Sequence, residues 1–240
     1  MRVPRIYTAQ ILSADAVVLL DGDTSHYLTT VLRMKPGRDL TLFDGRGGEY
    51  DASIDNIRKK LITVRVGKFR DINPESRLEI KLGICLIKND SMDWLLQKAT
   101  ELGATEFVPL FSDFTEIKLP KERVLKKLHH WKNIIRHACQ QSGRTRLPSI
   151  AEPLTFSEWL TVSADQKYIL HPYQAQTLAP EVQATRIALL AGPEGGFSET
   201  EFELARQHQF VPLSLGPRIL RAETAPLCAL SLIQHQLGDV

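Results

Sequence analysis

Short apolar runs separated by polar turns dominate the first part of the chain. Val17–Leu20 and Leu40–Phe43 are each followed by an Asp-Gly turn, and Leu61–Val66 is a third run of the same kind. Short strands joined by tight turns are typical of a small β-barrel. Within this region His26–Met34 is expected to form a short helix that ends before Gly37.

The pattern changes at the proline- and asparagine-containing stretch 71–75, which is expected to be a linker. From there, strand-like runs alternate with segments whose apolar residues have helical spacing. Strands are expected at 78–87, 107–111, 168–170, 186–191 and 211–215, and helices at 92–102, 121–141, 199–209 and 223–237. Ser198 and Glu201 form a Ser-x-x-Glu capping box at the start of one helix. This alternation predicts a mostly parallel sheet with helices on both faces.

Charge is unevenly distributed on a nearly neutral chain. Residues 1–71 hold twelve Lys and Arg against nine Asp and Glu, residues 118–146 hold nine against one, and residues 147–240 hold five against ten. Two basic regions on such a chain are typical of a protein that binds a ligand with a phosphate backbone. Each stretch taken alone is equally typical of a solvated helix face.

Apolar length and cysteine spacing exclude several classes of protein. No apolar run approaches the roughly 18 residues that a membrane span needs, and the arginines of MRVPRIY do not suit a signal peptide. A cytoplasmic protein without a membrane partner is therefore expected. Cys85, Cys139 and Cys228 lack CxxC spacing, which favours buried free thiols over a disulfide framework or a zinc site.

Two glycine-bearing loops each follow an expected strand and precede an expected helix. The first, AGPEGGFSE, spans 191–199, and the second, LGPRILRAETA, spans 215–225. The first has neither the lysine of a Walker A motif nor the GxGxxG fingerprint, which excludes a P-loop and disfavours a dinucleotide. Glycine lets a ligand approach bare backbone, and the two strands are expected to be neighbours. Both loops are therefore predicted to share one crevice at the carboxyl end of the sheet.

The two loops, in this order and at this spacing, resemble the RsmE family, bacterial methyltransferases of the SPOUT class that methylate N3 of a uridine in 16S ribosomal RNA. The resemblance covers essentially the whole chain, through MRVPRIY, HYLTTVLRMKPG, LFDGRGGEY, QKATELGATEFVPLFS and HHWKNIIRHACQQSGR. It implies an α/β protein with a PUA-like, RNA-binding β-barrel over residues 1–72. It also implies a SPOUT methyltransferase domain over residues 74–240, with a deep trefoil knot, the cofactor site and a homodimer interface. Ala222 stands where threonine is commoner in the family, so any role of a hydroxyl there is absent.

The resemblance further implies S-adenosyl-L-methionine (SAM) as the cofactor, without a metal. Its site is expected to comprise Leu170, His171, Gly192, Pro193, Glu194, Gly195, Leu215, Gly216, Ile219, Leu220 and Arg221. Plain core packing is the alternative for the leucines, and a structural cap is an equal alternative for His171. Glu194 either faces a cationic group or caps a nearby helix.

Methylation of uracil N3 requires removal of a proton and stabilisation of the negative charge that results. Arg221 and Arg218 are candidates for that stabilisation, since a guanidinium offers fixed donors to a carbonyl oxygen. Glu223 or a water molecule is the candidate proton acceptor. Glu223 and Thr224 are equally suited to cap the last helix.

RNA contacts are expected from basic residues of both regions. These residues are Arg2, Arg5, Arg33, Lys121, Arg144 and Arg146. The expected substrate is 16S rRNA within the 30S subunit, with the target base unstacked. Two alternatives remain open: a methyltransferase of the same fold that acts on a ribose 2′-hydroxyl, and a non-catalytic ribosome-assembly factor that binds the same RNA.

Overall fold

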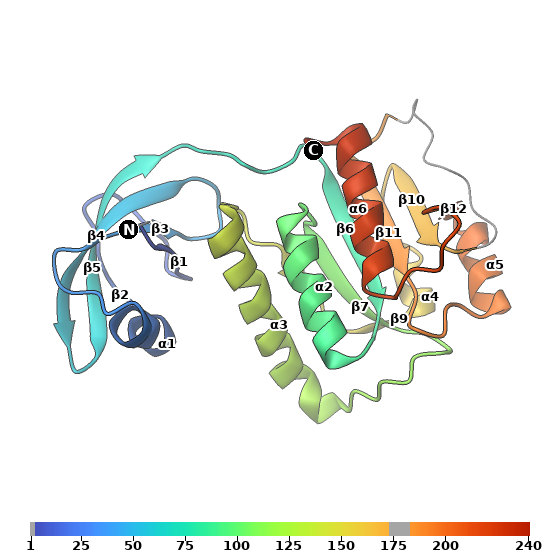
Figure 1. Ribbon diagram of the computed structural model, residues 1–240, viewed down its shortest axis with the longest axis horizontal. Helices are drawn as coiled ribbons and strands as arrows, with labels where there is room; N and C mark the ends of the chain where they lie inside the picture. The colour runs from blue at the N-terminus through green and yellow to red at the C-terminus, as the bar shows by residue number, and fades with distance from the viewer. Residues whose placement is uncertain (1–2, 173–182) are drawn as a thin grey trace. The chain divides into compact units, whose positions relative to one another are not determined.

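The computed structural model describes residues 3–172 and 183–240 (Figure 1). By its internal contacts the chain divides into two compact units. The first contains Met1–Glu75 and Cys139–Leu147, and the second contains Ser76–Ala138 and Pro148–Val240. The first unit is therefore assembled from two pieces of chain that are separated by a long segment of the second.

The first unit is built around a five-stranded sheet in the order β1-β3-β4-β5-β2. Its strands are β1 (Arg5–Tyr7), β2 (Val17–Leu19), β3 (Asp39–Phe43), β4 (Glu49–Arg58) and β5 (Leu61–Arg70). β1 pairs parallel with β3, and the other pairs are antiparallel. Alternate residues of β5, namely Ile62, Val64 and Val66, are fully buried in the core of this unit. Among the described residues the ladder ends at β1 and β2, so hydrogen bonding leaves the predicted barrel open.

The helical segment of the first unit begins earlier than the sequence pattern predicts. It consists of α1 (Gly22–His26), which continues as a π-helical turn, η1 (Tyr27–Val31). The Asp21 carboxylate accepts a hydrogen bond from the Thr24 backbone N–H at 2.8 Å, which is a side-chain cap. The prediction of one helix over 26–34 is wrong at both ends. The Asp-Gly pair taken for a turn caps the start of the helix, and the helical segment ends at Val31 as a π-helical turn.

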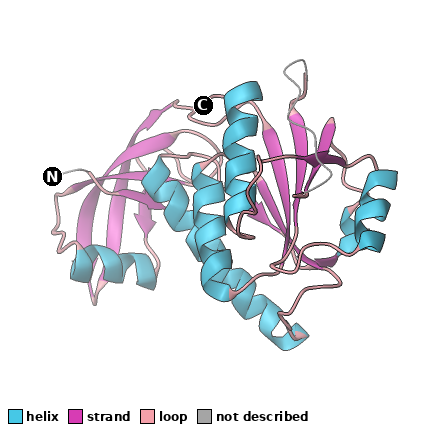
Figure 2. Ribbon diagram, turned by 45° about the vertical axis from the view of Figure 1, so that its right-hand side comes forward, coloured by secondary structure: helices cyan, strands magenta, loops and turns pink. Residues whose placement is uncertain are grey.

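The second unit is a parallel sheet covered by helices, as predicted. The strand order is β12-β10-β11-β6-β7-β8, with β9 also paired to β7, and every pair is parallel. The strands are β6 (Glu79–Cys85), β7 (Glu106–Phe111), β8 (Ser149–Ile150), β9 (Leu154–Thr155), β10 (Gln166–Leu170), β11 (Arg186–Ala191) and β12 (Val211–Leu213). The helices are α2 (Asn89–Glu101), α3 (Lys121–Ser142), α4 (Phe156–Trp159), α5 (Glu199–Gln207) and α6 (Thr224–Leu237). Figures 1 and 2 show α2 and α6 on one face of the sheet and α5 on the other.

The central strands are buried on both faces, which accounts for their nearly continuous apolar sequences. The four residues Ile187–Leu190 of β11 have no exposed surface. Trp159 of α4 packs so closely on β6 that a Cβ added at Gly83 would lie 2.8 Å from its ring. Glycine at this position is therefore required by space on the α4 side of the sheet.

The strand order corrects one expectation about the site. The strands that precede the two glycine-bearing loops, β11 and β12, are not neighbours, because β10 lies between them and pairs with both. Order along the chain therefore does not give order in the sheet. Three loops instead of two leave the sheet side by side, at the carboxyl ends of β10, β11 and β12.

Candidate active site

A cavity of about 370 Å³ lies at the carboxyl ends of β10, β11 and β12. Its walls come from three segments that we call the cavity loops: Leu170–Pro172, Ala191–Phe197 and Leu213–Ala225. The lining residues of the last loop are Leu213, Leu215, Gly216, Arg218, Ile219, Leu220, Ala222 and Ala225. All of the predicted cofactor residues except Arg221 line this cavity. Open α/β sheets bind ligands at this edge, so the geometry is that of a ligand site.

The loop after β11 is shaped by aromatic side chains. A Cβ at Gly192 would lie 3.1 Å from the ring of Phe197, and a Cβ at Gly195 would lie 3.0 Å from the Cβ of Phe114. Gly196 differs, because it has a φ of +74° and no atom within 4 Å of an added Cβ. Space thus favours glycine at the first two positions, whereas backbone conformation favours it at the third.

The predicted capping box at the start of α5 is confirmed. The Ser198 hydroxyl accepts a hydrogen bond from the Glu201 backbone N–H at 3.2 Å, and the Glu201 carboxylate accepts one from the Ser198 N–H at 3.0 Å. Glu201 also accepts from the Asp113 N–H at 2.9 Å. The same box therefore fixes the end of the β11 loop and the segment that follows β7.

The loop after β12 leaves backbone and apolar groups open to the cavity. Gly216 has a φ of +94°, and an added Cβ would meet no atom within 4 Å. Ile219 is 73% exposed although its side chain is apolar. Within the described residues, the backbone N–H groups of Ile219 and Leu220 have no hydrogen-bond partner. Such groups are those that a bound ligand can satisfy.

The carboxylate of Glu194 lies between the cavity and the start of α2. One of its oxygens accepts a hydrogen bond from the backbone N–H of Lys88, the residue before α2, at 3.2 Å. The capping alternative for Glu194 therefore has a specific contact in its favour. The side chain stays exposed and also lines the cavity, so both uses of the carboxylate remain compatible with its position.

His171 forms part of the cavity wall through an aromatic contact. Its ring lies against Phe202 of α5, with the ring centroids 4.3 Å apart. Burial lowers the pKa of the His171 imidazole below its ordinary value, since the charged form loses solvation. The ring is therefore neutral at neutral pH and presents an uncharged surface to the cavity.

The three predicted catalytic residues have different surroundings. Arg218 is exposed and lines the cavity, whereas Arg221 is exposed and does not line it. The carbonyl of Arg221 accepts hydrogen bonds from the N–H groups of Thr224 and Ala225 and so begins the turn that leads into α6. Glu223 precedes α6, but its side chain makes no capping hydrogen bond, so that alternative use of its carboxylate is not found.

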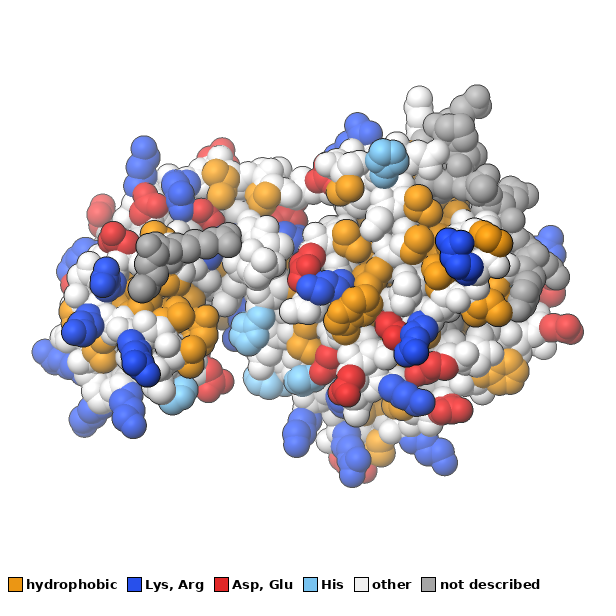
Figure 3. Space-filling view, in the orientation of Figure 1, with side chains coloured by type: hydrophobic (Ala, Val, Ile, Leu, Met, Phe, Trp, Pro, Cys, Tyr) orange, Lys and Arg blue, Asp and Glu red, His pale blue; other side chains and the backbone are white. Residues whose placement is uncertain are grey.

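The predicted RNA contacts fall into two groups, and the first consists of exposed residues. Arg33, Lys121 and Arg146 are exposed. Figure 3 shows Lys and Arg side chains around the first turns of α3, which begins at Lys121. Arg2 lies outside the described residues. For these three exposed residues, contact with RNA stays a prediction.

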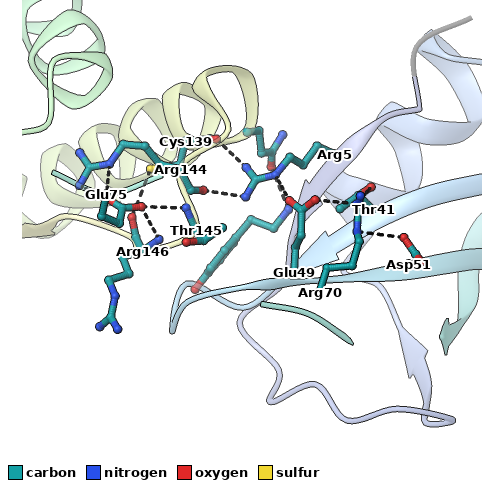
Figure 4. A network of polar contacts seen from close by, with 12 residues as sticks. Arg5, Thr41, Glu49, Asp51, Arg70, Glu75, Cys139, Arg144, Thr145 and Arg146 are labelled. Carbon is teal, nitrogen blue, oxygen red and sulfur yellow. Dashed lines mark hydrogen bonds and ion pairs between the residues drawn. The ribbon is translucent and has the colours of Figure 1, made fainter. Parts of the chain in front are cut away.

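Arg5 and Arg144 are instead held inside the first unit (Figure 4). Their side chains are 13% and 7% exposed. The Arg5 guanidinium pairs with Glu49 at 2.6 Å and donates to the carbonyls of Cys139 and Arg144, both at 2.7 Å. The expectation that these two arginines contact RNA does not fit this placement, because their donors are already used within the protein.

Sequence reasoning did not single out Glu75, which joins the two pieces of the first unit. One of its oxygens accepts hydrogen bonds from the backbone N–H groups of Thr145 at 2.8 Å and Arg146 at 2.9 Å. The other pairs with the Arg144 guanidinium at 2.8 Å. We call these four residues the Glu75 network. No local pattern signals it, because the partners lie about 70 residues farther along the chain.

The part of the chain that the structure describes contains neither a metal-binding cluster nor a disulfide. No group of three or more His, Cys, Asp or Glu residues there could hold a metal ion. The three cysteines are free, and burial raises the pKa of Cys85 to about 12 and that of Cys139 to about 11, so both thiols stay protonated. Among the described helices, none has the length and apolarity to cross a membrane.

Comparisons with known proteins cover both units. A family model described as an RNA methyltransferase domain matches residues 74–234, and one described as an RNA methyltransferase PUA domain matches residues 20–67. The ribosomal RNA small subunit methyltransferase E of Buchnera aphidicola (subsp. Schizaphis graminum) is 35% identical, and the match covers 100% of this chain and 98% of that relative. The protein of the same name from Bacillus subtilis is 29% identical, with 95% and 94% covered.

Two solved structures are similar over their full length. A putative methyltransferase from Legionella pneumophila, in complex with SAM, has a TM-score of 0.95 and 38% identity, and 100% of each chain is covered. The ribosomal RNA small subunit methyltransferase E of Neisseria gonorrhoeae, bound to S-adenosyl methionine, has a TM-score of 0.91 and 33% identity, with 99% of each chain covered. From the family models and these relatives, the chain belongs to the RNA methyltransferase family of the ribosomal RNA small subunit methyltransferases E.

Proposed function

We propose that this protein uses SAM to methylate N3 of a specific uridine in the 16S rRNA of the small ribosomal subunit. The observation that carries the proposal is the cavity formed by the three cavity loops, which gathers the predicted cofactor residues of two separate sequence motifs. It is supported by the names of the full-length relatives and by the SAM that two similar structures contain.

The residues around the cavity fit an adenosyl cofactor. Its volume of about 370 Å³ is within the range of small-molecule sites. Leu170, Leu215 and Ile219 supply apolar walls for a flat base, while the free N–H groups of Ile219 and Leu220 can bind its polar edge. When bound, SAM supplies an electrophilic methyl group on a positively charged sulfur. At Gly216 an added Cβ would meet no atom within 4 Å, so the backbone there is open to such a ligand.

The chain's own residues supply the rest of the chemistry. The uracil N3 must lose a proton, and the charge that develops spreads onto the neighbouring carbonyl oxygens. Arg218, at the cavity wall, is placed to donate to one of these oxygens, and Arg221 lies three residues further along the same loop. Glu223 has a carboxylate that is not used as a helix cap, which leaves it available to accept the proton.

The proposal extends to the architecture that the family resemblance implies. We propose that residues 1–72 serve RNA binding and residues 74–240 the transfer reaction, with a deep trefoil knot around α6. We further propose a cytoplasmic homodimer whose subunits act on the 30S subunit. Arg33, Lys121 and Arg146 are the exposed residues that we assign to RNA contact. Arg5 and Arg144 are assigned to holding the first unit together.

The test is a methyl-transfer assay on 30S subunits from a strain that lacks the enzyme. We expect the wild type to add a methyl group, detected by mass spectrometry as a mass shift on a uracil base within a nuclease fragment. A nuclease-resistant dinucleotide would instead indicate methylation of a ribose 2′-hydroxyl. Absence of SAM binding in a calorimetric titration of the intact protein would favour the ribosome-assembly factor.

The variant Arg221→Ala tests the assignment of the catalytic loop. We expect a near-complete loss of turnover with a far smaller change in SAM affinity, because Arg221 does not line the cavity. Arg206→Ala is the matched control, since Arg206 is an exposed arginine of α5 paired with Glu203. An equal loss of turnover and SAM affinity in Arg221→Ala would move this residue from catalysis to cofactor binding.

A further inference from the structure

Arg46 and Arg146 lie directly opposite each other in the first unit, although they are far apart in sequence. They form an isolated antiparallel β-bridge. The bridge is flanked by backbone hydrogen bonds from Gly47 to Thr145 at 3.2 Å and from Leu147 to Gly45 at 3.3 Å. This pattern is that of a non-hydrogen-bonded pair, in which the two side chains leave the same face and the Cα atoms are about 4.5 Å apart.

Two like charges in this arrangement repel each other. Opposed like charges in an antiparallel pair destabilise it, and the effect is largest in the close pair. Both arginines are exposed, and Figure 4 shows the Arg146 guanidinium pointing away from the Glu75 carboxylate. In the described part of the chain, neither guanidinium takes part in an ion pair. The described residues of this unit therefore hold two adjacent positive charges that have no ion-pair partner.

The nearby carboxylates are committed to other groups. Glu75 is occupied by the Arg144 guanidinium and by two backbone N–H groups. Asp44 accepts hydrogen bonds from the backbone N–H groups of Arg46 at 3.1 Å and Leu12 at 3.4 Å. Both carboxylates thus fix the backbone on which the two arginines are mounted and leave the guanidinium groups free. An arrangement that holds two cations together on a fixed backbone is suited to an anion with several acceptor oxygens.

Few side chains near the bridge can cover the two arginines. Gly45, Gly47 and Gly48 surround Arg46. A Cβ added at Gly47 would lie 3.6 Å from Nη2 of Arg146, so the Arg146 guanidinium lies across the bridge against this glycine. Because the side chains of Arg46 and Arg146 leave the same face of the bridge, a small group placed over that face lies beside both of them.

We propose that Arg46 and Arg146 form a phosphate clamp that binds a phosphodiester group of the RNA strand. The inference rests on the proposed function, which supplies the RNA substrate, and it adds the residue pair and the group that they bind. Binding of a phosphate relieves the repulsion between the two arginines. The clamp therefore contributes to affinity for RNA while it lowers the stability of the free protein.

The test compares Arg46→Ala and Arg146→Ala with the control variant Arg58→Ala. Arg58 is an exposed arginine of β4, so its substitution removes the same charge at a position outside the bridge. Filter binding of 16S rRNA is measured over a range of KCl concentrations. We expect each clamp variant to bind about tenfold more weakly than the wild type, as for a lost hydrogen bond to a charged group. We also expect the slope of log K against log salt to fall by about one, as for one lost phosphate contact. The double variant should lose less than the product of the two single effects, because both arginines bind one group.

Thermal unfolding of the free protein separates RNA binding from a structural role. If the two arginines stabilised the fold, their removal would lower the unfolding temperature. Arg46→Ala should unfold at an equal or higher temperature than the wild type, because the repulsion is removed. The proposal is overturned if both clamp variants match Arg58→Ala in affinity and salt slope, or if their weaker binding comes with a lower unfolding temperature. Failure of the wild type to methylate 30S subunits would overturn the proposed function alone, since the binding measurement does not depend on turnover.

Discussion

The cavity loops of the second unit and the Glu75 network of the first use polar groups in opposite ways. At the cavity, backbone N–H groups of Ile219 and Leu220 have no partner among the described residues. In the network, both oxygens of Glu75 accept hydrogen bonds from three consecutive residues. Groups without partners can bind a ligand, whereas groups that are fully paired hold the chain in one conformation. Both regions are made of loops, but the cavity loops are suited to bind a ligand, whereas the Glu75 network stabilises the first unit.

The largest effect is expected from breaking the network with Glu75→Ala. The substitution removes the carboxylate that Glu75 offers to the buried Arg144 guanidinium and to two backbone N–H groups. Removing one partner of a buried ion pair lowers the free energy of unfolding by about 3–5 kcal/mol, and we expect a loss of this size in urea denaturation. Asp55→Ala is the control, since Asp55 pairs with Arg65 on the exposed surface, and it should cost less than about 1 kcal/mol. Equal losses for the two variants would show that the network does not hold the unit together.

A smaller effect on stability, but a specific one on binding, is expected from Gly216→Ala. Gly216 has a φ of +94° and open space before it, so alanine there suffers backbone strain of about 1–2 kcal/mol without a clash. Gly37→Ala is a matched control, because Gly37 has a φ of +80° and equally open space in the first unit. Both variants should lose similar stability in urea denaturation, while only Gly216→Ala should lose more than about tenfold in SAM affinity by calorimetry. A SAM affinity that is equal in both variants would remove Gly216 from the cofactor site.

The smallest effect is expected from the titration of His171. Burial lowers its pKa in the folded protein, so the unfolded chain binds the proton more readily. The stability contributed by the neutral ring is present above the ordinary histidine pKa and is lost as the pH falls below it. We expect His171→Phe to show a smaller drop in unfolding temperature between about pH 7 and pH 5 than the wild type.

His137 provides the comparison for this measurement. Its pKa is also lowered, chiefly by burial and then by Arg136, so it contributes to the pH dependence in the same direction. His137→Phe should therefore retain the part of the pH dependence that belongs to His171. An unchanged pH dependence in His171→Phe would show that the cavity wall does not depend on the neutral imidazole.

The local features of the fold were predictable from the sequence because they depend on neighbouring residues. The Ser198–Glu201 capping box and the buried strand 186–191 follow from spacing over a few positions, and the structure contains both. Asp21 shows the limit of this reasoning. The same Asp-Gly pair suits a turn and a helix cap, and in the structure it caps a helical segment whose continuation buries Leu28.

The parts that the sequence did not reveal depend on contacts between distant segments. The position of β10 between β11 and β12 is a property of the sheet as a whole. Arg5 and Arg144 are basic residues of the kind that an RNA-binding surface contains. Their ion-pair partners, Glu49 and Glu75, lie tens of residues away in the sequence, so local sequence does not reveal the pairing. Charge along the chain therefore predicted where basic residues occur, but not which of them remain exposed.

The division of the first unit into two pieces has a consequence for biosynthesis. In a chain made from its N-terminus, Glu75 and Arg5 are translated well before Cys139 and Arg144. Glu75 then lacks its donors, and Arg5 has Glu49 as an acceptor but not the two later carbonyls. The five strands of the first sheet all precede residue 75, but residues 139–147 are added only after β6, α2, β7 and most of α3 have left the ribosome. A truncated gene that stops at residue 75 would encode a product without residues 139–147, and therefore without the three residues that donate to Glu75.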